Sequence, residues 1–320
     1  MTKYIEKNSQ QLFLLIVIVV IGGFLTIKSE YFLTPSNLIN IADSCGYRLI
    51  MAVGMTFIMA SGVMDLSAGS TVSLAGVITA WMLHAGAGIP LSVAAGLLTG
   101  IAAGVLNGLL IHYTKISFFI ITLAMSGMLR GISLIITGGR PITRFGAAFM
   151  TIGTGRLAGI QISVWIAVIL TLAAAVVLNC TRWGSYIRTL GSNPEALQKC
   201  GIGIAGYRIS VQAVMGLAAA ITAVIITARL NSAEPNAGMD MELDAITVAM
   251  GGTPITGGKS RISGTMLAVI ILGIIRNGLT LMSISSDYQQ WITGFLLLVS
   301  VLVSGIRIKN TKQKYTRKGE

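Results

Sequence analysis

Few side chains in this 320-residue sequence could perform covalent or metal chemistry. The histidines and cysteines stand apart from one another, at His84, His112, Cys45, Cys180 and Cys200. Such isolated residues lack the spacing of a metal site, and three cysteines do not fit a disulfide framework. Neither the lone histidines nor the carboxylates suggest a catalytic pair. The sequence therefore predicts that this chain is not an enzyme.

Residues 251–260 read GGTPITGGKS, which approaches the phosphate-binding loop of nucleotide-hydrolysing proteins. That loop needs four residues between its first glycine and the Gly-Lys pair. Thr253 stands where the first glycine before Gly258 and Lys259 would have to be. A glycine-rich turn between two helices explains the segment better, and we predict that this chain binds neither ATP nor another cofactor itself.

Polar residues inside apolar stretches are candidates for a solute path. An arginine at the depth of Arg130 costs about 2.5–3.5 kcal/mol to insert into a bilayer, so it should face protein or water. Arg130 could tether backbone carbonyls between helices or line the path, and both remain open. The amide of Asn107 should also face protein or water. Arg276 and Asn277 are adjacent and could form one polar patch.

The turn at residues 61–70, SGVMDLSAGS, places small and polar residues beside two helix ends. Broken helices of this kind bring polar backbone to a path across a membrane, although a simple turn remains the alternative. The residues predicted to line the path are Asp65, Ser67, Asn107, Arg130 and Asn277. No Asp or Glu stands securely at mid-span, which favours a neutral, hydrogen-bonding solute driven from outside this chain.

Four glycines recur every fourth residue, at Gly96, Gly100, Gly104 and Gly108. They share one helical face and present no side chain, so they predict close packing against another helix. Gly127 and Gly131 are a weaker version of the same pattern.

The composition identifies the elements that carry these residues. Apolar residues make up 54% of the chain, charged residues make up 11%, and the mean hydropathy is +0.80. Soluble domains carry about 25% charged residues, so we predict an all-α polytopic membrane protein in which some helices are short or broken. Ten spans are expected. Seven are clearly apolar, at 12–27, 89–113, 116–137, 157–180, 209–231, 262–282 and 288–305, and three contain more glycine and polar residues, at 44–60, 71–88 and 241–256.

Charge sets the expected orientation. The net charge is +12, and residues 306–320 form a basic tail after a single membrane domain over 1–305. The positive-inside rule places this tail, and with ten spans both termini, in the cytoplasm. Loop 138–156 disagrees, since its three arginines would lie outside. Residues 12–27 are expected to be an uncleaved first helix.

Residues 181–208 form the longest polar stretch between spans. Asn193 precedes Pro194 and Glu195, an order that is typical of a helix start. Gly201 suits a helix end. We therefore expect a short helix on the cytoplasmic face, which could be a connector or a docking element for a soluble partner.

The run GSNPEA at 191–196, followed by Gly201, resembles the coupling-helix region of the permease subunits of ribose-type ABC importers. The resemblance extends over about residues 12–305. Further matches in order lie at 62–69, 107–108, 122–123, 130–131, 138–142, 228–230, 242–246, 251–253, 257–258, 264–265, 277–279 and 285–289.

This resemblance implies a second permease copy, as a homodimer or heterodimer, in the bacterial cytoplasmic (inner) membrane. It also implies an ATP-binding cassette ATPase that uses ATP and Mg, an extracytoplasmic sugar-binding protein, and no nucleic acid. The residues implied to couple the chain to the ATPase are Gly191, Ser192, Asn193, Pro194, Glu195, Ala196 and Gly201. The expected function is membrane transport of a monosaccharide or similar polyol. A secondary, ion-coupled transporter of a small neutral solute is the alternative.

Overall fold

A computed structural model describes residues 2–253, 257–258, 260–285, 288–292, 294–295 and 298, without the side chains of residues 2–10. The predicted tail at 306–320, most of the predicted span at 288–305, and Lys259 lie outside these described residues. Most of the described chain is helical. The helices are α1 (Thr2–Lys28), α2 (Pro35–Ala60), α3 (Ala68–His84), α4 (Ile89–Thr114), α5 (Phe118–Thr137), α6 (Ala147–Thr154), α7 (Ile162–Cys180), α8 (Arg182–Ser192), α9 (Pro194–Lys199), α10 (Ile204–Leu230), α11 (Met241–Ala249) and α12 (Ile262–Leu281).

Within the described residues, seven helices are long and apolar enough to cross a membrane: α1, α2, α4, α5, α7, α10 and α12. Six of them coincide with strongly apolar stretches in the sequence. The seventh, α2, contains the less apolar predicted span at 44–60 but starts earlier, at Pro35, where the Thr34 side chain caps the helix by accepting from the Asn37 amide. The fold is therefore the all-α, polytopic membrane class that the composition predicted.

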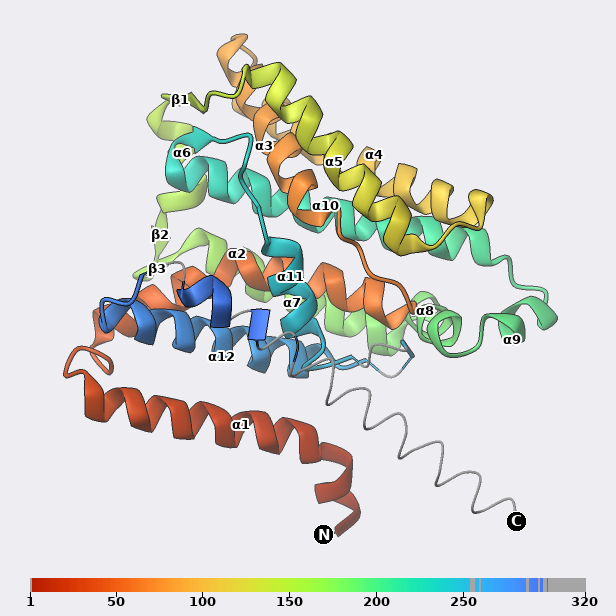
Figure 1. Ribbon diagram of the computed structural model, residues 1–320, viewed down its shortest axis with the longest axis horizontal. Coiled ribbons are helices and arrows are strands. Elements are labelled where there is room, and N and C mark those ends of the chain that lie inside the picture. The colour runs from red at the N-terminus through yellow and green to blue at the C-terminus, as the bar shows by residue number, and fades with distance from the viewer. Residues whose placement is uncertain are drawn as a thin grey trace.

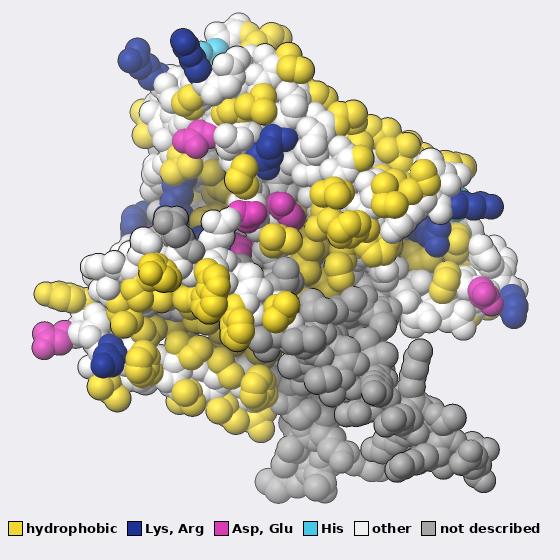
Figure 2. All heavy atoms as spheres, in the orientation of Figure 1, with side chains coloured by type: hydrophobic (Ala, Val, Ile, Leu, Met, Phe, Trp, Pro, Cys, Tyr) yellow, Lys and Arg dark blue, Asp and Glu magenta, His cyan; other side chains and the backbone are white. Residues whose placement is uncertain are grey.

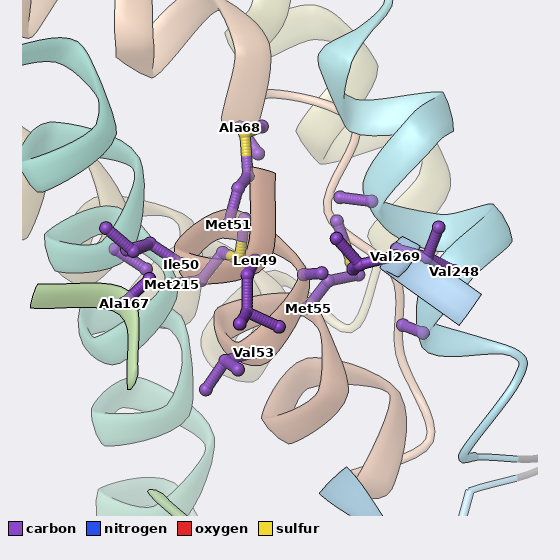
Figure 3. Close-up of a cluster of buried hydrophobic side chains, with 14 of the residues drawn as sticks. Leu49, Ile50, Met51, Val53, Met55, Ala68, Ala167, Met215, Val248 and Val269 are labelled. Atoms are coloured by element: carbon purple, nitrogen blue, oxygen red, sulfur yellow. The ribbon is translucent and has the colours of Figure 1, made fainter. Parts of the chain in front are cut away.

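Helices α2 and α10 form the centre of the bundle (Figure 1). Helix α10 packs against α3, α4 and α6, whereas α2 packs against α7, α11 and α12, and the two central helices contact each other. The core is formed largely by α2, whose side chains meet α10 at Met215 and α12 at Val269 (Figure 3). Helix α1 lies along the outer edge against α12. Polar residues of α2 are tolerated because neighbouring helices, not lipid, cover them.

The four spaced glycines of α4 lie against backbone of other helices. A Cβ at Gly100 would collide with the Gly216 carbonyl oxygen of α10, and one at Gly104 would lie 2.8 Å from the Gln212 carbonyl carbon. Gly108 meets the same helix, whereas Gly96 meets α3. The missing side chains therefore let α4 and α10 approach closely.

Gly127 and Gly131 of α5 differ from this pattern, because no described atom lies within 4 Å of a Cβ placed on either. The expectation of close packing at these two glycines is wrong within this chain. The four-residue spacing of two glycines predicts that they share a helical face. Whether another helix packs against that face depends on the tertiary structure.

Two pairs of very short antiparallel strands form hydrogen bonds between loop segments. Strand β1 (Ile142–Thr143) pairs with β4 (Ser232–Ala233), and β2 (Arg156–Leu157) pairs with β3 (Ile160–Gln161). The β2–β3 hairpin takes up the first residues of the predicted span at 157–180, so α7 begins later than expected. Together with α6, these strands fold the arginine-bearing loop 138–156 onto one end of the bundle (Figure 1).

Candidate functional site

The turn between α2 and α3 lies inside the protein. Helix α2 ends at Ala60, Gly62 takes the left-handed backbone conformation with φ +83°, and α3 begins at Ala68. The Asp65 carboxylate accepts from the Ser67 backbone amide at 2.8 Å and from the Ser67 hydroxyl at 2.6 Å. Asp65 is 2% exposed and Ser67 is fully buried. This side chain thus satisfies backbone and hydroxyl donors at the start of α3 in place of water.

Asn107 of α4 joins this turn. Its Nδ2 donates to the Ser67 hydroxyl at 2.7 Å, and its Oδ1 has no hydrogen-bond partner among the described residues. Asp65, Ser67 and Asn107, here called the α3-start cluster, therefore form one buried polar chain. The structure brings these three predicted path residues together.

Arg130 of α5 holds the segment that precedes α11. Its guanidinium donates to the Pro235 carbonyl at 3.1 Å and to the Ala237 carbonyl at 3.5 Å. Of the two open interpretations of Arg130, these bonds match the tether between backbone carbonyls. The same segment also reaches α3, since the Ser73 hydroxyl donates to the Pro235 carbonyl at 2.6 Å.

Glu242 of α11 was not predicted as a site residue. A Cβ on Gly69 of α3 would collide with the Glu242 carboxylate, so this carboxylate lies directly against the first turn of α3. Figure 2 shows acidic side chains gathered in a hollow at the middle of this face. In the sequence, the run at 242–246 belongs to the family resemblance, and a lone glutamate gives no spacing signal that would mark it as a site residue.

Asn277 does not join the α3-start cluster. It exchanges two hydrogen bonds with Asn37 of α2, at 2.7 and 3.0 Å, whereas the adjacent Arg276 forms an ion pair with Asp244 of α11 at 2.7 Å. The expected patch of Arg276 and Asn277 is therefore wrong, because neighbouring residues on a helix point in different directions.

The inference of a neutral solute from the lack of carboxylates at mid-span does not hold, because three carboxylates are buried in the bundle. Asp43, Asp65 and Asp244 are 2%, 2% and 8% exposed. Asp43 accepts from Arg156 at 3.3 Å and from the Gln161 amide at 3.2 Å. Each of the three has a charged or hydrogen-bonding partner that compensates its burial. A neutral solute therefore cannot be deduced from missing carboxylates.

The segment at 181–208 contains the expected short helix, preceded by α8. The Asn193 side chain caps α9 by accepting from the Ala196 amide at 3.1 Å, and Gly201 ends the turn with φ +73°. Leu197 is buried, whereas Glu195 is exposed. Helix α9 is thus anchored on one face and free on the other.

Two glycine-containing turns, at Gly62 and Gly258, meet the end of α8 at Gly191. The Gly258 amide donates to the Ala60 carbonyl at 3.0 Å, and a Cβ on Gly191 would lie 2.9 Å from the amide nitrogens of both Gly62 and Gly258. Side chains would force these backbones apart. The α8–α9 segment is consequently in direct contact with the turn that leads into the α3-start cluster.

Comparison with known proteins identifies the architecture. The model of the family described as branched-chain amino acid transport system / permease component matches residues 37–301. The chain is 39% identical to the ribose import permease protein RbsC of Escherichia coli strain K12, over 90% of this chain and 92% of that protein. It is 34% identical to the D-allose transport system permease protein AlsC of the same organism, over 60% and 59% of the two chains.

A solved structure shares the fold. It is described as a metal-chelate type ABC transporter in an inward-facing conformation, with a TM-score of 0.54, 12% identity, and coverage of 94% of this chain and 98% of that one. The chain therefore belongs to the branched-chain amino acid transport system / permease component family, as a relative of the ribose import permeases.

Proposed function

We propose that this chain, the membrane subunit of an ABC importer, carries a monosaccharide of the ribose type. The observation that carries this proposal is the 39% identity to a ribose import permease over nine-tenths of both chains. The α3-start cluster supports it, because buried hydroxyl, amide and carboxylate groups can exchange hydrogen bonds with sugar hydroxyls.

The partners follow from the same proposal. We infer that the exposed face of α9 binds an ATPase subunit, which uses ATP and Mg, while an extracytoplasmic binding protein delivers the sugar to the opposite face. A second permease copy completes the transporter in the bacterial inner membrane, with both termini in the cytoplasm. The capped, half-exposed geometry of α9 supports its role as the docking element.

The test is uptake of labelled ribose by proteoliposomes that contain this chain, its ATPase and its binding protein. We expect uptake that requires internal ATP and the binding protein. Uptake driven by an ion gradient in liposomes that contain only this chain would instead support the secondary transporter. Absence of ATP-dependent ribose uptake by the complete system would overturn the proposed substrate.

Replacing Pro194 and Glu195 by alanine is expected to uncouple ATP hydrolysis from transport. Hydrogen bonds to charged groups contribute about 1.5–3 kcal/mol, so the loss of one docking contact at Glu195 should weaken ATPase docking about tenfold or more. The measurements are sugar-stimulated ATPase activity and ribose uptake in the same proteoliposomes. Arg140→Gln is the matched control, since it removes an exposed charge near β1, at the end of the bundle away from α9 (Figure 1). Normal coupling in the double variant would contradict the role of α9.

Asn107→Ala is expected to lower the maximal rate of ribose uptake without changing the sugar concentration at half-saturation. Asn107 lies in the α3-start cluster, and net hydrogen-bond contributions of about 0.5–1.5 kcal/mol correspond to a rate change of up to about tenfold. Asn277→Ala is expected to lower the amount of folded protein instead, because it removes both hydrogen bonds between α12 and Asn37 and leaves only the bond from the Asn37 Nδ2 to the Phe32 carbonyl. A shift in half-saturation at constant maximal rate in Asn107→Ala would place sugar selection in this chain.

A further inference from the structure

A cavity of about 210 Å³ lies among the end of α2, the α8–α9 segment, α4 and α10. Its walls include Gly191 and Pro194 from the α8–α9 segment, and Arg208 and Gln212 from α10. No residue of the α3-start cluster lines it. With water occupying about 30 Å³ per molecule in the liquid, the cavity has the volume of about seven waters. This is below the roughly 300–1,000 Å³ of drug-sized sites and matches a small metabolite.

Arg208 supplies a positive charge at this cavity. Its side chain is half-buried, and its guanidinium forms no hydrogen bond or ion pair with the residues that the structure describes. A guanidinium is planar and presents paired donors that match a phosphate or a carboxylate. An anionic group in the cavity would be complementary to this arginine.

Gln212 supplies a second, different signal. It is 2% exposed, and neither its Nε2 nor its Oε1 has a hydrogen-bond partner in the described part of the chain. A buried amide without partners is costly, and an amide that offers both a donor and an acceptor is complementary to hydroxyl groups. Arg208 and Gln212 are four residues apart on α10, so their side chains lie on the same face of the helix.

We propose that this cavity binds a small polyol with one anionic group, either a phosphate monoester or a carboxylate. Arg208 holds the anion, and Gln212 turns its amide toward the hydroxyls. The ligand bridges α10 to the α8–α9 segment and to the end of α2, so its binding restrains the junction of Gly62 and Gly191. The effect on transport rests on the proposed function. Restraint of the junction of Gly62 and Gly191 lowers ATP-driven uptake, so an anionic derivative of the imported sugar inhibits uptake from the cytoplasm.

The test measures binding to the full chain in lipid nanodiscs by titration calorimetry. The probes are ribose 5-phosphate, ribonate, ribose and inorganic phosphate. We expect saturable binding of an anionic polyol, with ribose and inorganic phosphate each about tenfold weaker or more, as the loss of one charge-assisted interaction predicts. Tighter binding of ribose 5-phosphate than of ribonate identifies the phosphate monoester, and the reverse identifies the carboxylate.

Two substitutions tie the binding to this cavity. Arg208→Gln should weaken the binding of the anionic polyol about tenfold or more, and Gln212→Met, which keeps the side-chain length but removes the amide, should reduce the preference for the polyol over inorganic phosphate. Arg182→Gln is the matched control, since Arg182 is an exposed arginine of α8 that does not line the cavity.

The proposal is overturned by absence of saturable binding, by ribose or inorganic phosphate binding as tightly as the anionic polyols, or by binding that survives both Arg208→Gln and Gln212→Met. Uptake of ribose by the complete transporter is a separate measurement. A failed binding test with normal uptake therefore rejects this site alone, and saturable binding without uptake rejects the proposed function alone.

Discussion

Leucine in place of Gly104 is expected to abolish folded protein. A Cβ at this position would already lie 2.8 Å from the Gln212 carbonyl carbon and 3.0 Å from the Ala213 Cα, and both atoms belong to the backbone of α10. Backbone atoms cannot rotate away as a side chain does, so α4 and α10 would have to separate. The cost should exceed the roughly 1–3 kcal/mol of ordinary core overpacking. The measurement is the yield of monodisperse protein in detergent by size-exclusion chromatography.

Gly127→Leu is the matched control for this prediction. Gly127 also lies in an apolar helix, but no described atom lies within 4 Å of a Cβ placed on it. We expect folded protein from this variant in yields close to those of the parent. Equal yields from Gly104→Leu and Gly127→Leu would show that the close approach of α4 and α10 does not contribute to stability.

Arg276→Met is expected to lower the free energy of unfolding by about 3–5 kcal/mol, the usual cost of leaving one member of a buried ion pair alone. The Arg276 guanidinium lies 2.7 Å from the Asp244 carboxylate, and the two side chains are 22% and 11% exposed. This ion pair joins α12 to α11. The substitution removes the cation and leaves the Asp244 carboxylate in the interior without it. Unfolding in detergent by SDS titration, followed by circular dichroism, measures the loss.

The double variant Arg276→Met with Asp244→Leu tests the cause. Replacing both members of a buried ion pair by apolar residues is often neutral, so we expect it to recover most of the lost stability. A double variant at least as unstable as the sum of the two single variants would mean that the charges do not stabilise each other. Transport by the double variant then shows whether the ion pair also has a functional role.

The class of protein and most of its helices follow from the sequence alone. Apolar stretches without charge must become helices in a bilayer, because only internal hydrogen bonds satisfy their backbone there. Helix α9 was equally predictable, since the cap at Asn193 and the ending at Gly201 are local features of the chain. Residues close in sequence decide such features, so no knowledge of the tertiary structure is needed.

Which polar residues contact one another depends on the tertiary structure. Asn107 bonds to Ser67 across 40 positions, and Asn277 bonds to Asn37 across 240. Such pairs depend on the rotation and register of whole helices, which the apolar pattern leaves open. Gly104 is covered by α10 whereas Gly127 is not, although each belongs to a run of glycines spaced four apart. A helix presents a face by its own sequence, but what covers that face is set by the packing of the rest of the chain.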